Sequence, residues 1–218
     1  MNKRNYQKEL DKKILEFQKE GVVPTLFLHS CCAPCSSYCL EYLAEYFSIT
    51  VFYYNPNISQ EAEYLHRVEE QKRLIAAYNE TKKGYPIEIV EGDYVPGQFF
   101  EIAKGYENCP EGGERCFRCF DLRLRETARL AKAEGYDYFA TTLTISPLKN
   151  AAKINEIGQD LAMEYDVLWL PSDFKKKNGY KRSIELSAEY DLYRQDYCGC
   201  AYSKAERDVR LRGEEATK

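Results

Sequence analysis

The sequence predicts an α/β protein, with a doubly wound, mostly parallel sheet of five strands and helices on both faces. Five short runs rich in β-branched and aromatic residues alternate with helix-length segments that have one apolar face. The 218 residues are 44% apolar and 30% charged, which is enough to bury one sizeable core. Glycine and proline are scattered and no internal repeat occurs, so a single domain over residues 1–218 is expected.

The predicted elements follow in order along the chain. A leading helix is predicted over residues 3–20, where Leu10, Ile14 and Phe17 recur at the spacing of one helix face. The predicted strands cover residues 22–29, 49–54, 87–90, 138–142 and 167–170. Between them, helices are predicted at about 35–47, 59–82, 117–134 and 149–165. Strands that alternate with helices imply right-handed crossovers, so the sheet is expected to be Rossmann-like and similar to the adenine nucleotide α-hydrolase-like folds.

Two loops of this sheet are the first candidates for a site. Ligands of open parallel sheets bind beyond the carboxyl ends of the strands, so the loops after His29 and after Thr142 come first. The second loop carries several hydroxyls and Lys149, which can hold a polar substrate. The alternative for Ser146 is a helix cap, with Pro147 in the first turn.

Charge and hydropathy exclude two classes of function. Lys plus Arg number 31 and Asp plus Glu number 35, a net charge of −4, so the molecule is not a general polyanion binder, although a local basic patch is compatible with it. No stretch reaches the roughly 18 consecutive apolar residues of a membrane span, and the first residues lack the apolar centre of a signal peptide. We expect a soluble, cytoplasmic protein without a membrane partner.

Nine cysteines in such a chain indicate metal or redox groups before structural disulfides. Seven of them form three groups, namely Cys31, Cys32 and Cys35; Cys116 and Cys119; and Cys198 and Cys200. The thiolate is the form that binds metal, and a helix N-terminus near Arg115 and Arg118 favours it. Two cysteines stand alone, and we expect Cys39 in the core and Cys109 in a loop.

The number and distribution of the grouped thiols favour an iron–sulfur centre. Structural zinc usually takes four ligands from two knuckles close in sequence, whereas these thiols come from three distant segments. They exceed the needs of one tetrahedral ion but suit a cluster with a second metal, or a cluster with redox-active thiols. Zinc with a catalytic disulfide is the competing interpretation.

Two sets of basic residues are candidates for contact with phosphate groups. Residues 173–182 interleave two aromatic residues with Lys175, Lys176, Lys177, Lys181 and Arg182. That combination suits single-stranded RNA, and the alternative is an exposed loop after the last strand. In the helix predicted at 117–134, Arg125 shares a face with Arg118 and Arg129, which is either a solvated face or a contact for an anion.

Seven stretches of the chain form a combined pattern. They are residues 29–34 (His-Ser-Cys-Cys-Ala-Pro), 111–119, 122–128 (Leu-Arg-Leu-Arg-Glu-Thr-Ala), 141–147 (Thr-Thr-Leu-Thr-Ile-Ser-Pro), 149–150, 182–187 and 193–200 (Tyr-Arg-Gln-Asp-Tyr-Cys-Gly-Cys). Together they resemble the cobalamin-independent epoxyqueuosine reductase family, also called QueH. The resemblance covers nearly all of the chain after residue 22, and the combination of motifs is highly specific.

The resemblance implies the last step of queuosine synthesis, the two-electron removal of the epoxide oxygen from epoxyqueuosine at the wobble position of a tRNA anticodon. It implies a [4Fe–4S] cluster and an adjacent mononuclear iron, with the tRNA and an unidentified electron donor as partners. Carried over residue by residue, the metal ligands are Cys31, Cys32, Cys116, Cys119, Cys198 and Cys200. Cys35 is a seventh candidate, at a family position expected to vary between Cys and an acid.

The same chemistry needs a proton donor. The candidates are His29, beside the first thiols, and the polar residues of the loop at 141–150. The alternative for His29 is a strand-end histidine whose ring is satisfied within the fold. No cobalamin is expected, because the chain lacks the Asp-x-His-x-x-Gly signature.

Two other functions compete with this interpretation. A tRNA-thiolating enzyme of the pyrophosphatase-loop type needs a Ser-Gly-Gly-x-Asp-Ser phosphate cradle after the first strand. This chain has Ser-Cys-Cys-Ala-Pro-Cys at residues 30–35, so no use of ATP is expected. A zinc-stabilised RNA-binding module is the other competitor, and it would be colourless and hold zinc without iron or sulfide.

Overall fold

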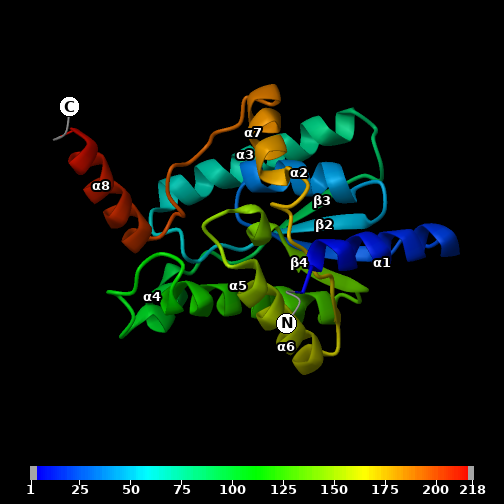
Figure 1. The fold of residues 1–218 in the computed structure, drawn as a ribbon, viewed down its shortest axis with the longest axis horizontal. Coiled ribbons are helices and arrows are strands. Elements are labelled where there is room, and N and C mark those ends of the chain that lie inside the picture. The colour runs from blue at the N-terminus through cyan, green and yellow to red at the C-terminus, as the bar shows by residue number, and fades with distance from the viewer. Residues whose placement is uncertain (1–3, 216–218) are drawn as a thin grey trace.

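A five-stranded parallel sheet organises the chain (Figure 1). The computed structural model describes residues 4–215, so residue 3 of the predicted leading helix lies outside the described residues. The strands are β1 (Thr25–Ser30), β2 (Ser48–Tyr53), β3 (Glu88–Glu91), β4 (Tyr138–Thr141) and β5 (Leu168–Trp169). Their order in the sheet is β3-β2-β1-β4-β5. The predicted fold class is confirmed.

Eight α-helices and a 3-10 turn are seen in the described part of the chain. They are α1 (Tyr6–Glu20), α2 (Ala33–Leu43), α3 (Glu61–Glu80), α4 (Pro96–Ala103), α5 (Glu114–Ala133), η1 (Thr142–Ile145), α6 (Ala151–Tyr165), α7 (Gly179–Glu189) and α8 (Ala201–Glu215). Three of these helices, α4, α7 and α8, were not predicted. In Figure 1, α8 extends away from the sheet at the end of the chain.

Alternation along the strands creates two cores, one on each face of the sheet. Leu26 and Leu28 of β1 belong to the core formed with α1, α2, α3 and α7. Phe27, between them, belongs to the core formed with α5 and α6. Figure 1 shows α2, α3 and α7 on one side of the sheet and α5 and α6 on the other. The middle strand is therefore covered on both faces, as is usual for a parallel sheet.

The strand order places a topological switch between β1 and β4. From β1 the chain crosses to β2 on one side, and from β4 it crosses to β5 on the other. The two connections diverge at the carboxyl ends of these neighbouring strands, where they leave a crevice. The segment after Ser30 and the segment after Thr141 lie at that crevice, as predicted for the loops after β1 and β4.

Local chemistry shifts several element boundaries from the predicted ones. The first strand begins at Thr25 and not at residue 22, since Val22 and Val23 are exposed and Pro24 has no backbone N–H to donate to a neighbouring strand. The strand predicted at 138–142 ends one residue earlier, because the Thr141 side chain accepts a hydrogen bond from the backbone N–H of Leu143 and starts η1.

The basic tract at 173–182 is not an open loop. Phe174 within it is fully buried, and Gly179 starts α7. A Cβ atom at Gly179 would lie 1.9 Å from the carbonyl oxygen of Phe174 and 2.4 Å from the ring of Tyr38. The glycine therefore allows α7 to begin close against α2, a tertiary contact that no local pattern predicts.

In the described residues, no helix combines the length and the apolar character that crossing a membrane requires.

Candidate functional site

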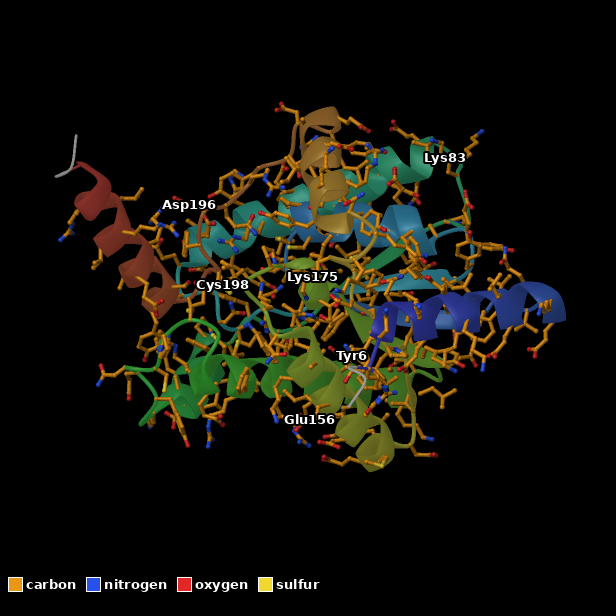
Figure 2. All side chains as sticks on the ribbon, in the orientation of Figure 1. Tyr6, Lys83, Glu156, Lys175, Asp196 and Cys198 are labelled. Atoms are coloured by element: carbon orange, nitrogen blue, oxygen red, sulfur yellow. The ribbon has the colours of Figure 1, made fainter. Side chains whose placement is uncertain are left out.

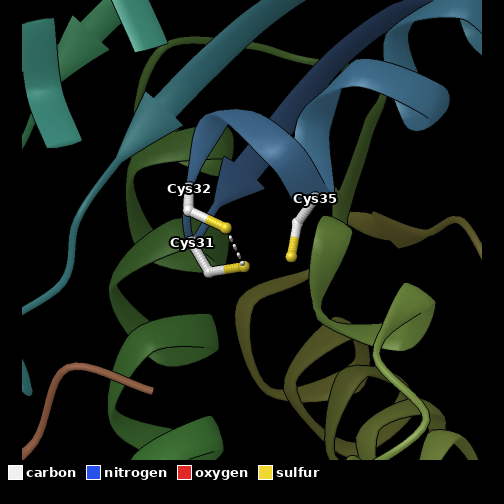
Figure 3. Close-up of side chains that lie close together, drawn as sticks. All are labelled: Cys31, Cys32 and Cys35. Atoms are coloured by element: carbon white, nitrogen blue, oxygen red, sulfur yellow. Dashed lines mark hydrogen bonds between the residues drawn. The ribbon is translucent and has the colours of Figure 1, made fainter. Parts of the chain in front are cut away.

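Three thiols meet where β1 gives way to α2, and we call them the triad: Cys31, Cys32 and Cys35 (Figure 3). Their Sγ atoms all lie within 4.8 Å of one another, and those of Cys31 and Cys32 are 3.8 Å apart. The turn is tight because Cys32 is the extended residue that caps α2, and Pro34 in the first turn needs no hydrogen-bond acceptor. Tetrahedral ligands at about 2.3 Å from one ion place their sulfur atoms roughly 3.8 Å apart, so the triad is spaced for a single metal ion.

The pKa values of the three thiols are shifted in different directions. Hydrogen bonds from the thiols of Cys32 and Cys35 hold the pKa of Cys31 well below its usual value, against the effect of burial, and Thr142 adds a further bond. Hydrogen bonding to the Cys31 sulfur raises the pKa of Cys32 to about 12, and it raises that of Cys35 as well. One thiolate is therefore already stabilised, and a metal ion would displace the remaining protons.

Four further thiols line a second, small cavity, and we call them the tetrad: Cys116, Cys119, Cys198 and Cys200. The first two come from the start of α5, and the last two from the segment that joins α7 to α8, where Figure 2 labels Cys198. Among the residues that the structure describes, only the triad brings three potential ligand atoms within 4.8 Å, so the tetrad is more widely spaced. Wider spacing suits a cluster, in which each sulfur binds a different iron.

Two glycines with positive φ shape the tetrad. Gly112, with φ +86°, donates its backbone N–H to the sulfur of Cys116 at 3.2 Å. Gly199, with φ +116°, lies between the last two cysteines, where a Cβ atom would be 2.9 Å from Ile58 and 3.2 Å from Arg67. Both positions require a backbone conformation that residues with a Cβ atom rarely adopt.

The cavity of the tetrad is lined partly by apolar side chains. Phe99, Phe120 and Leu148 line the same cavity. Burial raises the pKa of Cys119 to about 12 and also raises those of Cys116 and Cys200. Metal binding at these thiols would therefore release protons.

Cationic side chains surround both thiol groups. Arg67 is buried, pairs with Glu63 and donates to the carbonyl oxygen of Cys198 at 3.1 Å. Lys149 lines both cavities. Burial disfavours its ammonium form, but the sulfurs of Cys198, Cys31 and Cys35 outweigh that effect and hold the pKa of Lys149 above its usual value.

A larger cavity of about 710 Å³ opens over the triad. Its size is in the usual range of small-ligand sites. Cys198 lines this cavity as well as the small one, so one thiol of the tetrad shares the larger cavity with the triad. Its walls include Tyr180 of α7, Arg194 in the segment after it, and Arg207 and Arg210 of α8. The walls therefore combine an aromatic ring with several cations.

The predicted proton donor, His29, is fully buried at the end of β1. Its Nδ1 lies 2.8 Å from Oγ1 of Thr141, and its Nε2 lies 3.0 Å from the carbonyl oxygen of Tyr54. Burial and the charge of Arg123 lower the pKa of His29 to about 3. These contacts match the alternative of a satisfied strand-end histidine, and the catalytic role of His29 stays a prediction.

The predicted phosphate-binding residues differ in their partners. Lys177 pairs with Asp11, and Lys175 pairs with Asp173. Arg182 pairs with three acids, which are Glu41, Glu185 and Glu189. Arg125 pairs with Asp121 and Glu164 on the α5–α6 side, and it does not line the larger cavity. Lys176 and Lys181 are exposed at the start of α7.

The two isolated cysteines lie apart from both groups of thiols. Cys39 is 0% exposed in the core, where burial raises its pKa well above the usual value. Cys109 lies in the loop before α5, and its carbonyl oxygen accepts a hydrogen bond from Arg115.

Three residues of the site had no role in the sequence reasoning, namely Arg67, Arg207 and Arg210. Arg123 and Arg194 entered it only as parts of motifs that carry the family resemblance, without a role of their own. Arg194 stands four residues before Cys198, a proximity that could have suggested it. Arg67 gave no such signal, because its spacing from Glu63 is that of an ordinary surface ion pair on a helix.

Comparison with known proteins agrees with this site. A family model described as epoxyqueuosine reductase QueH matches residues 26–206. The epoxyqueuosine reductase QueH of Streptococcus pyogenes serotype M1 is 45% identical over 207 residues, which cover 95% of this chain and 81% of that protein. The protein of the same name from Staphylococcus epidermidis is 44% identical over 207 residues, covering 94% of this chain and 87% of the relative. The one from Thermotoga maritima is 33% identical over 189 residues, covering 84% and 92%. The likeness extends over the thiol groups and most of the sheet, and on that basis the chain belongs to the epoxyqueuosine reductase QueH family.

Proposed function

We propose that this protein is an oxidoreductase that removes the epoxide oxygen from epoxyqueuosine at the wobble position of a tRNA anticodon and so forms queuosine. The observation that carries the proposal is a cavity of about 710 Å³ lined by all three thiols of the triad and by Cys198 of the more widely spaced tetrad. The names of the relatives support the substrate. In the net reaction the oxygen leaves as water, and two electrons and two protons are taken up.

The residues present fit a [4Fe–4S] cluster and a neighbouring mononuclear iron. The tetrad would hold the cluster, with one thiol for each iron and backbone N–H groups of Gly112 and Ser203 directed at its sulfurs. The triad would hold the single iron and leave a position open towards the larger cavity. When bound, such a centre supplies electrons one at a time and a Lewis-acid position for an oxygen atom.

Lys149 supplies a positive charge at the junction of the two cavities. Its ammonium group keeps a proton on Nζ, because the nearby sulfurs favour the charged form. In the proposed reaction this charge stabilises the negative charge that develops on the departing oxygen. Lys149 thus contributes to the reaction itself as well as to substrate binding.

The tRNA backbone would cross the mouth of the larger cavity. Arg207 and Arg210 of α8 line the cavity wall, and so does Tyr180 of α7. Lys181, next to Tyr180, and Lys176, just before α7, are exposed. Arg207 pairs with Asp196 and Asp208 and would have to exchange them for phosphate. The same holds for the other members of the predicted set, which also have acidic partners, namely Arg125, Lys175, Lys177 and Arg182.

The test of the proposed function begins with anaerobic purification and with iron, sulfide and zinc analysis. Incubation with epoxyqueuosine-containing tRNA and a chemical reductant is expected to yield queuosine, measured by mass spectrometry of the nucleosides. A colourless protein with zinc and no iron would point to an RNA-binding module instead. A strict need for added ATP or cobalamin would contradict the proposal.

The tRNA surface is tested separately by binding. Neutralising Lys176 and Lys181 together is expected to weaken tRNA binding and to flatten its salt dependence, because two phosphate contacts are lost. Lys132→Gln is the matched control, since Lys132 is exposed in the last turn of α5 and pairs with Asp166. Equal affinity of all three proteins at two salt concentrations would contradict this part of the proposal.

A further inference from the structure

Arg123 is a buried cation without an acidic partner. It lies on α5, one turn after Cys119, and is 1% exposed. Its Nε donates to the carbonyl oxygen of Cys119 at 3.3 Å, and its Nη1 donates to Oδ1 of Asn55 at 3.2 Å. Its Nη2 is buried and has no hydrogen-bond partner. Within residues 4–215, no ion pair to a carboxylate involves Arg123, whereas Arg67 and Arg115, which are also buried, each have one.

Such a guanidinium is costly to bury alone, because Arg stays protonated in proteins. Burial acts against the charged form of Arg123, but the sulfurs of Cys119, Cys198, Cys31 and Cys116 hold its pKa above the usual value. These sulfurs belong to both the triad and the tetrad. Four cysteine side chains line the same small cavity as Arg123, so sulfur ligands of a bound metal are the negative groups placed to balance its charge.

The position of the Arg123 side chain agrees with a role in balancing negative charge on the thiols. Arg123 lines the small cavity together with all four thiols of the tetrad. Asn55, which holds its Nη1, is itself fixed by a hydrogen bond from its Nδ2 to the carbonyl oxygen of Ser30, at the end of β1. The guanidinium is thus held between the strand that leads to the triad and the helix that carries half of the tetrad.

We propose that Arg123 is a positioning residue whose buried charge is the built-in counterion of the thiolate-bound metal centre. The inference rests on the proposed function, because it needs a centre at the tetrad. A four-iron cluster with four thiolates carries net negative charge and becomes more negative on reduction. A fixed cation beside it favours retention of the cluster, and it favours the reduced state more than the oxidised one.

The experiment compares Arg123→Gln, Arg123→Lys and the surface control Arg129→Gln. Each protein is loaded anaerobically with iron and sulfide. Three quantities are measured, which are the loss of iron to a chelator, the midpoint potential of the cluster and the melting temperature with and without metal. None of them depends on turnover.

Arg123→Gln is expected to lose iron about tenfold faster or more, as is typical when a group that supports metal ligands is removed. Its midpoint potential is expected to fall, and loading is expected to raise its melting temperature less than that of the wild type. Arg123→Lys, which keeps the charge, is expected to restore the potential in large part. Arg129→Gln should behave like the wild type.

A purely structural role would give another result. In that case Arg123→Gln would melt lower by the same amount with and without metal, and its potential would be unchanged, which would overturn the inference. If Arg123→Gln does not fold, Arg123→Lys decides, because a Lys variant that loads but has lost the wild-type potential would equally overturn it. A wild-type protein that takes up no iron or sulfide would overturn the proposed function as well.

Discussion

Replacing Cys119 by Ala separates a metal ligand from a packing residue, and Cys39→Ala is its matched control. Both thiols are buried in helices, with Cys119 5% and Cys39 0% exposed. Removing a buried sulfur costs about 1–2 kcal/mol through lost contacts and the cavity left behind. In a chain of 218 residues that corresponds to a melting temperature lower by roughly 2–8 °C. The two metal-free variants are therefore expected to melt at similar temperatures.

The loaded proteins should differ sharply. If the tetrad holds a [4Fe–4S] cluster and the triad holds one ion, the wild type should contain about five irons and about four sulfides per chain. Cys119→Ala is expected to lose most of the iron and nearly all of the sulfide, while Cys39→Ala keeps both. The assay is iron and sulfide analysis of anaerobically prepared protein, with epoxyqueuosine reduction as a second readout. Full iron, sulfide and activity in Cys119→Ala would refute the assignment of the tetrad.

Three further predictions concern the triad, the cavity wall and the packing of α1. Cys35→Ala is expected to lose about one iron and keep the sulfide. Cys35→Asp is expected to retain more activity, because it restores a negative ligand. Equal iron content in the two variants would contradict this role. Arg210→Gln is expected to reduce the salt dependence of tRNA binding by about one counterion. Arg212→Gln, on the same helix but outside the cavity wall, should leave it unchanged. A salt slope of Arg210→Gln equal to that of the wild type would argue against α8 as part of the tRNA surface. Burial acts to raise the pKa of Asp11, but hydrogen bonds from Lys177, Tyr42 and Gln7 outweigh burial and lower that pKa. The contribution of Asp11 to stability is therefore present above its pKa in the unfolded chain, near pH 4. It is lost as the pH falls through its pKa in the folded protein. Asp11→Asn should therefore destabilise the protein by about 0.5–1 kcal/mol at neutral pH and by less in acid, as urea unfolding would measure, and a cost independent of pH would exclude an ionic origin.

The sheet was predictable because its signals are local. Leu26, Phe27 and Leu28 are consecutive residues that alternate between the two cores, so neighbouring residues are enough to predict the strand. The switch from strand to helix is likewise indicated locally, by Pro34. The missed helix α7 depends on a contact across the fold, because its first residue, Gly179, packs against the ring of Tyr38 in α2. No window of neighbouring residues contains that information.

The candidate site also has one part that local sequence predicts and one part that it does not. The sequence predicted three groups of thiols, and the proximity of Cys31, Cys32 and Cys35 follows from one tight turn. That the other four thiols share one cavity depends on how the segment after α7 folds back onto α5, which spacing alone does not reveal. Arg123 is a sharper example, because its neighbours are Asn55 after β2, Cys119 in α5, and thiols of the segments after β1 and before α8. The sequence shows it only as part of the motif at 122–128 and does not reveal those neighbours.

The contacts of His29 have a mechanical consequence. One imidazole ring joins Thr141 at the end of β4 to the backbone just after β2, so the tips of three adjacent strands are tied together where the triad begins. A polar network of this kind, fully satisfied and shielded from water, resists shear between the strands. The turn bearing Cys31 therefore rests on a stiff support. Its sulfurs have little freedom to shift, so a metal ion held there in the proposed reaction would meet nearly the same ligand positions before and after a change of charge.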